Sequence, residues 1–462
     1  MTDPTTERRA SASDAGVLEL LRLFRGHEAA ADRYAAACLE RAKAIEPLLK
    51  AFEYLPVDTT RRPGPLSGIP VAIKDIIATS DMPTTNGSPV YKGYVPDADA
   101  WVVERLRNLG ATIFGKTVST EFAWRHPGPT VNPWNSNHTP GGSSSGSAAA
   151  VAAGIVPLAL GTQTLGSVIR PAAFNGVVGL KPSFGAIPRI GVHPLSPSLD
   201  HVGFFARCVD DVALALSLLA GSSDGDPHGR PLPGFHVDVH KGLAPLNQPR
   251  LGIVRFEKWS RAELEQQKAF EAATEKLRDA GAVLEELELS ELDHTNWKAI
   301  NAILASEAAV IFTDLVAGYP DRSSDHLKSL VESGRLVPAT DYLAAKALQE
   351  KWRSALDAEI SGYDAILTLP AFGEAPLGLH YTGDAEYCAP WTLLGVPAVT
   401  LPVGFGKSGL PLGLQIVAPY RSDHRLLQTA KWIETVLKFE PGRPKGLQSR
   451  GISNIFAANE QA

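Results

Sequence analysis

The sequence contains little cysteine and no excess of positive charge. Its three cysteines, Cys38, Cys208 and Cys388, are far apart among 462 residues and form no metal-like pair. We therefore expect free thiols, no metal ion and no cofactor. The formal net charge of −6 offers no concentrated basic face of the kind that attracts nucleic acid or an anionic membrane. These absences favour a cytoplasmic protein without a nucleic-acid partner.

The sequence also has no long run of small apolar residues. The longest one, 148–160, is interrupted by Gly154 and Pro157 and is too short to cross a bilayer. Residues 1–16 are polar and mixed in charge, unlike a secretory signal or a transit peptide. We expect no membrane partner, and a protein that is a monomer or a homodimer.

Buried-strand patterns occur on both sides of a long helical region. Apolar runs typical of buried strands lie at 68–74, 111–114, 155–160, 365–369, 396–403 and 412–417. Between about 210 and 360 the sequence is more charged, and its apolar residues recur at helical spacing. The pattern predicts a single α/β domain over 1–462, with a mixed central β-sheet flanked by helices. The core would comprise about 15–209 and 361–440, and a helical cap would be inserted at about 210–360.

Residues Gly110–Thr117 match the P-loop expression G-x-x-x-x-G-K-[ST] at every position. A P-loop needs a strand before its first glycine and a helix after its last residue, so that free N–H groups surround phosphate. Here a helical pattern precedes Gly110, and the intervening residues are apolar and strand-like. We interpret the segment as a corner between a helix and a strand.

Residues Gly142–Gly146 match the G-x-S-x-G expression of a nucleophile elbow, with Ser144 in the central place. An elbow serine follows a buried strand directly. The residues before Ser144 have the composition of a loop, and no acid–histidine pair stands out downstream. We therefore do not interpret Ser144 as a nucleophile.

Several motifs occur in an order that resembles the amidase signature family. A strand pattern ends at Lys74, a Gly/Ser cluster follows at 139–150, and a second turn lies at 161–172. Ser143 comes 69 residues after Lys74, and Ser167 comes 24 residues after Ser143. Later segments that also match are 179–183, 394–403 and 410–416. The resemblance covers nearly the whole chain and is weakest at 210–360.

The resemblance implies a Ser–cis-Ser–Lys site. Ser167 would be the nucleophile, Ser143 the proton relay after a cis peptide bond from Gly142, and Lys74 the base. A serine hydroxyl needs such a base within hydrogen-bond reach. A buried lysine can act as one because burial disfavours its charged form. The family's oxyanion hole would be formed here by the backbone N–H groups of Thr164, Leu165, Gly166 and Ser167.

Two positions depart from the family's usual pattern. Leu165 stands where glycine is usual, so its side chain would narrow or line the acyl pocket. Arg170 lies three residues after Ser167, as in malonamidase-like members, where the arginine holds a substrate carboxylate. The alternative is that Arg170 ties its loop to a nearby acid or carbonyl. Further candidates for substrate binding are Gly142, Trp391, the loop 124–130 and the helical insertion.

The resemblance implies a hydrolase that cleaves C–N bonds of small amides through a Ser acyl-enzyme. Linear amides, aryl amides, carbamates (urethanes), ureas and esters stay open as substrates. An alternative is the amidotransferase (glutaminase) component of a tRNA-dependent complex, which would need partner subunits. A third is a binding protein with impaired catalysis, suggested by Leu165 alone.

Overall fold

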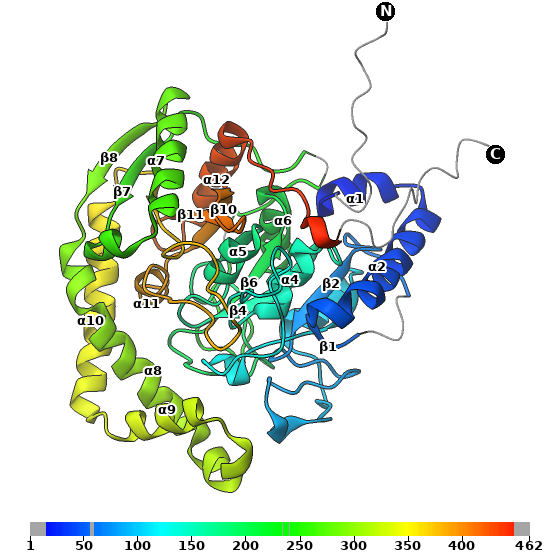
Figure 1. The fold of residues 1–462 in the computed structure, drawn as a ribbon, viewed down its shortest axis with the longest axis horizontal. Coiled ribbons are helices and arrows are strands. Elements are labelled where there is room, and N and C mark those ends of the chain that lie inside the picture. Colours follow the sequence, from blue (N-terminus) through cyan, green and yellow to red (C-terminus); the bar gives the residue numbers. More distant parts are fainter. Residues whose placement is uncertain (1–14, 56–59, 233, 240, 448–462) are drawn as a thin grey trace, which may run out of the picture.

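The computed structural model describes residues 15–55, 60–232, 234–239 and 241–447. Within them, eleven strands form one mixed sheet in the order β1-β3-β2-β4-β6-β5-β10-β11-β9-β7-β8 (Figure 1). The strands are β1 Phe52–Tyr54, β2 Pro70–Lys74, β3 Thr112–Thr117, β4 Leu158–Gln163, β5 Val178–Lys181, β6 His201–Ala206, β7 Arg250–Val254, β8 Val283–Leu287, β9 Ala365–Thr368, β10 Ala398–Phe405 and β11 Pro411–Val417. The mixed α/β architecture agrees with the prediction.

Helices cover the sheet and extend beyond it on one side (Figure 1). They are α1 Val17–Phe24, α2 Glu28–Leu49, α3 Trp101–Asn108, α4 Ser145–Ala152, α5 Ile169–Asn175, α6 Val209–Leu219, α7 Leu264–Asp279, α8 Ser290–Gly318, α9 Asp325–Arg335, α10 Ala339–Glu359, α11 Ala389–Leu393 and α12 Asp423–Leu437. Short 3₁₀ helices lie at Pro89–Tyr91, Glu121–Ala123, Glu257–Arg261, Pro320–Arg322 and Lys445–Leu447.

The strand β2 positions the candidate base. It pairs in parallel with β3 on one side and with β4 on the other, and every residue of Pro70–Lys74 is buried. Helix α4 packs against β2 and β4, and its small residues are all buried. Parallel strands covered on both faces read as continuous apolar runs, so a lysine at the end of β2 enters the protein interior.

The predicted helical insertion contains more than helices. Strands β7 and β8 fall within it and extend the sheet beyond β9 by parallel pairing. Helix α8 packs against both α9 and α10, and the three helices form the lower left part of the molecule in Figure 1. Within α8, Trp297–Gly318 is long and apolar enough to span a membrane, but half of its most apolar window is buried inside the protein. Its buried apolar residues pack against neighbouring helices.

The two misleading expressions are explained by the backbone. Residues 110–117 run from the turn after α3 into β3, where the N–H groups take part in the sheet. Lys116 is completely buried beside Asp75, so the corner interpretation was right. Ser144 precedes α4 without a strand before it, and its hydroxyl donates to the Thr162 carbonyl.

Candidate active site

Lys74 is a fully buried lysine whose amine faces hydroxyl groups. Its Nζ lies 2.7 Å from Ser143 Oγ and 2.8 Å from Thr162 Oγ1, and its exposed fraction is 0%. Burial lowers the pKa of Lys74 well below its usual value, while the charge of Asp200 opposes this effect. The amine therefore favours its neutral form, which can accept a proton.

Ser143 lies between Lys74 and the cavity described below. The peptide bond from Gly142 to Ser143 is cis, as the resemblance implied. The preceding Gly141 has φ +80°, and a Cβ there would come within 3.0 Å of Pro171, so glycine suits this position. The segment thus presents the Ser143 hydroxyl to Lys74 on one side and to the cavity on the other.

Ser167 lies in the turn between β4 and α5. The Gln163 side chain fixes this turn, because its Oε1 accepts the N–H groups of Val168 and Ile169 at 2.9 and 3.0 Å. Its Nε2 donates to Thr392 Oγ1, which in turn donates to the Leu165 carbonyl at 2.8 Å. Both polar atoms of the Gln163 amide group thus help to shape the loop that carries Ser167.

The turn brings backbone donors beside Ser167. In the part of the chain that the structure describes, the N–H groups of Leu165, Gly166 and Ser167 donate to no other group. A Cβ on Gly166 would lie 3.1 Å from the Cβ of Cys388 and 3.2 Å from that of Ala385. The turn therefore packs tightly on the 385–388 segment, and its N–H groups are held in place without being consumed.

A cavity of about 200 Å³ opens at these residues. Ser143, Ser167, Thr164 and Leu165 contribute to its wall, so the structure brings the two serines and the candidate oxyanion turn to one space. Other parts of the wall come from the loop after residue 122, from the helical insertion and from the 380–385 segment; these residues are Trp124, Arg125, Trp297, His326, His380, Tyr381, Thr382, Gly383, Asp384 and Ala385.

Arg170 reaches this cavity from α5 and also braces the cis peptide segment. Its Nη2 donates to the Gly142 carbonyl at 2.6 Å and to Thr382 Oγ1 at 3.4 Å. Its Nε is buried without a partner among the described residues. Burial lowers the pKa of Arg170, and the charge of Asp384 opposes the change. The guanidinium ties its loop to a carbonyl, and it also lines the cavity.

Two other predicted substrate-binding residues lie elsewhere. Trp391 is completely buried on α11 and packs on Phe256, with ring centroids 5.6 Å apart; it does not line the cavity. Gly142 contributes its carbonyl to Arg170 rather than a surface to the cavity. A tryptophan among apolar residues more often belongs to the core than to a binding site, and Trp391 lies in the core.

Sequence reasoning missed the polar residues that support the site from other segments. Thr162 contacts Lys74, and Asp200 accepts the Thr164 hydroxyl at 2.6 Å. Asp384 lines the cavity as well. Thr162 lies within the recognised turn 161–172 and was open to prediction, whereas Asp200 and Asp384 are brought near only by the fold. Arg125 and His326 also line the cavity; they lie in the loop 124–130 and in the helical insertion, which were both candidates from the sequence.

Comparisons with known proteins identify the family of this chain. The family model described as Amidase matches residues 20–427. A glutamyl-tRNA(Gln) amidotransferase subunit of Symbiobacterium thermophilum is 35% identical, over 92% of this chain and 97% of the relative. Its counterpart in Halothermothrix orenii is 32% identical, over 94% and 99%. The native peptide amidase from Stenotrophomonas maltophilia superposes with a TM-score of 0.82 at 29% identity, over 93% of this chain and 98% of that one.

The family match spans most of the chain, and relatives above 30% identity cover nearly all of it. The shared architecture extends to solved amidases. The chain belongs to the Amidase family and is an amidase-signature hydrolase.

Proposed function

We propose that the protein hydrolyses the C–N bond of a small linear amide through an acyl-enzyme on Ser167. The observation that carries this proposal is the buried amine of Lys74, 2.7 Å from Ser143 Oγ, beside a cavity that Ser143 and Ser167 both line. A neutral lysine in hydrogen-bond contact with one serine, next to a second, supplies what an activated hydroxyl nucleophile needs.

In the proposed reaction, Lys74 accepts the proton of Ser143 while Ser143 accepts that of Ser167. The Ser167 oxygen attacks the carbonyl carbon, and the N–H groups at 164–167 stabilise the oxyanion; losing one such donor typically costs about 3–4 kcal/mol. Collapse breaks the C–N bond as Ser143 gives its proton to the leaving amine or ammonia and takes one back from Lys74, which becomes neutral again. Water then attacks the ester with the same base, releasing the acid and restoring Ser167.

The proposed acyl side of the cavity is limited by Leu165. Leu165 is part of the cavity wall, and each methylene of apolar contact contributes about 0.8 kcal/mol. Leu165→Gly should therefore favour bulky acyl groups over small ones, while loosening the turn lowers kcat on small substrates. kcat/KM across acyl chains of increasing length tests this, and a constant ratio to wild type would exclude Leu165 from the acyl pocket.

A second candidate is the glutaminase component of a tRNA-dependent amidotransferase. The two bacterial relatives named above are components of such an enzyme by name, and they match over almost their whole length. The cavity wall also carries opposite charges, Arg170 and Asp384, which suit the carboxylate and the ammonium of an amino-acid amide such as glutamine. Both candidates use the same acyl-enzyme chemistry and differ in substrate and partners.

Turnover by the purified chain separates the candidates. Ammonia release from L-glutamine would be compared with hydrolysis of p-nitroanilides, simple aliphatic amides and p-nitrophenyl carbamates, each with Ser167→Ala as the control. Turnover of the simple amides or carbamates supports a free-standing amidase or urethanase. Glutamine as the preferred substrate, together with a loss on Asp384→Asn, supports the glutaminase. No Ser167-dependent turnover and no labelling of Ser167 by a fluorophosphonate would contradict both.

A further inference from the structure

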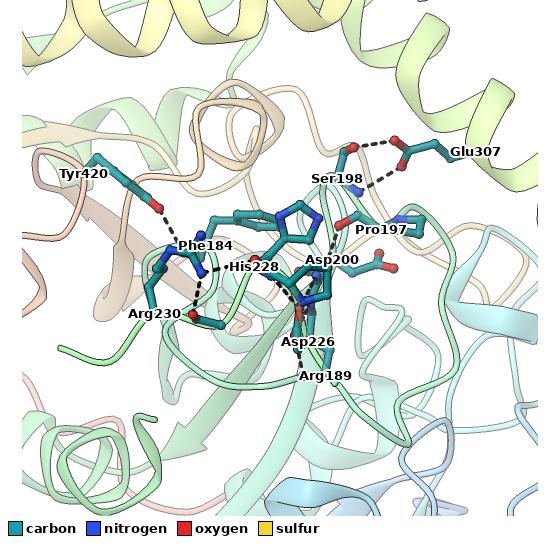
Figure 2. A network of polar contacts seen from close by, with 12 residues as sticks. Phe184, Arg189, Pro197, Ser198, Asp200, Asp226, His228, Arg230, Glu307 and Tyr420 are labelled. Carbon is teal, nitrogen blue, oxygen red and sulfur yellow. Dashed lines mark hydrogen bonds and ion pairs between the residues drawn. The ribbon is translucent and has the colours of Figure 1, made fainter. Parts of the chain in front are cut away.

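A carboxylate of the helical insertion is bonded to a loop of the core. Glu307 on α8 accepts the Ser196 hydroxyl at 2.6 Å and the Ser198 N–H at 2.9 Å through one oxygen. Its other oxygen accepts the Ser198 hydroxyl and, at 3.0 Å, the hydroxyl of Tyr342 from α10. Figure 2 shows Glu307 reaching Ser198 from above the loop. Four hydrogen bonds thus converge on one carboxylate at the boundary between insertion and core.

The loop 195–200 is also closed from inside. The Asp200 carboxylate accepts the N–H groups of Leu195 and Ser196, both at 2.9 Å. Arg189 Nη1 donates to the carbonyls of Pro197 and Asp200, and Asp226 holds the same guanidinium by an ion pair (Figure 2). The loop has no regular secondary structure, so these side chains, rather than a helix or a sheet, determine its shape.

The same Asp200 carboxylate reaches the active site. Its Oδ1 accepts the Thr164 hydroxyl at 2.6 Å, and Thr164 begins the turn that carries Ser167. Leu195, at the other end of the loop, lines the catalytic cavity. A continuous set of bonds therefore leads from Glu307 through the loop 195–200 to Thr164.

We propose that Glu307 and Asp200 are positioning residues that together fix the oxyanion turn, so that the helical insertion sets the geometry of the nucleophile. The inference rests on the proposed function. Glu307 touches no reacting atom and acts through Ser196 and Ser198 on Asp200. A displacement of about 1 Å at a catalytic group can cost roughly 100-fold in rate. A residue such as Glu307, which contacts no reacting atom, can therefore still control turnover by holding the oxyanion turn in place.

The first test replaces Glu307 and a matched neighbour. Asp314 also lies on α8, is exposed and has no hydrogen bond to the loop 195–200 among the described residues. Glu307→Ala should slow both kcat and fluorophosphonate labelling of Ser167 by about 10- to 100-fold, with KM changed less. Asp314→Ala should leave both unchanged. Glu307→Gln keeps one acceptor oxygen and should fall between wild type and Glu307→Ala; it serves as the test if Glu307→Ala does not fold.

The second test asks whether Glu307 acts through Thr164. Thr164→Val keeps the shape of the side chain and removes its bond to Asp200. If the two residues lie on one path, the double variant Glu307→Ala/Thr164→Val should be no slower than the slower single variant. Fully additive losses in labelling rate would overturn the inference.

The third test uses Asp200→Asn, which retains an acceptor but removes a charge. Lys74 and Arg189 are the charged groups that face this carboxylate, and Glu307 lies beyond the loop. Because the Asp200 charge raises the pKa of Lys74, its removal should move the rising limb of the kcat/KM profile, where Lys74 loses its proton, to lower pH. A slower enzyme with an unshifted profile would reduce Asp200 to a structural role and overturn its part of the inference.

These outcomes are distinct from failure of the proposed function. If wild-type Ser167 is not labelled and no amide is turned over, the proposed function fails. If wild-type Ser167 is labelled and folded Glu307→Ala and Glu307→Gln are labelled at the wild-type rate, the proposed function stands and the positioning role is wrong.

Discussion

Two buried lysines stand at the ends of the neighbouring parallel strands β2 and β3, and they differ in what each amine faces. Lys74 contacts the hydroxyls of Ser143 and Thr162. Lys116 also contacts a hydroxyl, that of Thr84, but it lies 3.3 Å from the Asp75 carboxylate and donates to the Ile77 carbonyl at 2.8 Å. Burial lowers the pKa of Lys116 to about 8, with Asp75 opposing the shift. Among the described residues, no carboxylate lies within ion-pair distance of Lys74.

A third lysine shows that burial alone does not make a base. Lys181 is completely buried, and burial lowers its pKa to about 7. Its amine donates to the carbonyls of Val396 and Pro182, which have no proton to give. A catalytic lysine requires burial, a hydroxyl partner and a cavity beyond that hydroxyl. Of these three buried lysines, Lys74 alone meets all three requirements.

The largest expected effect comes from removing the base. Lys74→Met should reduce kcat by roughly four to six orders of magnitude, the range seen when a member of a catalytic triad is removed. Ser167→Ala should do the same. Ser144→Ala is the matched control, since Ser144 neighbours Ser143 without contacting Lys74, and it should keep substantial activity. An active Ser167→Ala with an inactive, folded Ser144→Ala would restore the nucleophile elbow and refute the assignment.

A smaller effect should follow from giving Lys74 the kind of partner that Lys116 has. Thr162→Asp would place a carboxylate beside the Lys74 amine. A nearby opposite charge shifts a pKa by roughly 1–3 pH units, here upward, so less of the amine is neutral at pH 7. kcat/KM at pH 7 should fall about 10- to 100-fold and recover at higher pH. Thr162→Asn is the uncharged control; an equal loss in both variants, unaffected by pH, would show that only packing was disturbed.

A still smaller effect than that of Thr162→Asp should be the dependence of wild-type kcat/KM on pH. Neutral Lys74 is the form that accepts a proton, so kcat/KM should rise by up to about tenfold per pH unit below the Lys74 pKa and level above it. Because burial lowers that pKa well below the usual value, the rise should be complete before the range in which ordinary lysines titrate. A steady fall from about pH 6 to 9, with stable enzyme and substrate, would contradict a lysine base.

Sequence patterns were sufficient for the elements whose signal is local. The strand ending at Lys74 was expected from its apolar run, and all of its residues are buried in the structure. Strand β8 was missed because none of its residues is fully buried and it carries Glu285 and Glu286, so no apolar run marks it. Strand β3 continues beyond the predicted 111–114. The prediction stopped before Lys116 because a lysine is usually exposed, whereas this one is buried in an ion pair with Asp75.

The candidate site was predictable in part for the same reason. Lys74, Ser143 and Ser167 lie in three recognisable motifs, and the fold brings those motifs together. The supports of the site depend on approaches between distant segments: Thr164 to Asp200 spans 36 residues, and Ser196 to Glu307 spans 111. A single carboxylate in a long helix carries no local mark of such a contact. Trp391 was expected to bind substrate but is buried in the core. The identity of an aromatic residue does not by itself show whether it lies in the core or lines a cavity.

The smallest expected effect on turnover comes from Lys116→Met, although its effect on stability is large. The change leaves Asp75 buried without its cation, and breaking a buried pair typically costs about 3–5 kcal/mol. Denaturant unfolding should show this loss, and Asp75→Asn/Lys116→Met should recover much of it. Since Lys116 contacts neither Ser143 nor Ser167, fluorophosphonate labelling of the folded variant should stay within about threefold of wild type. If folded Lys116→Met is as inactive as Lys74→Met, the two lysines share one proton network, and the distinction between base and ion pair is wrong.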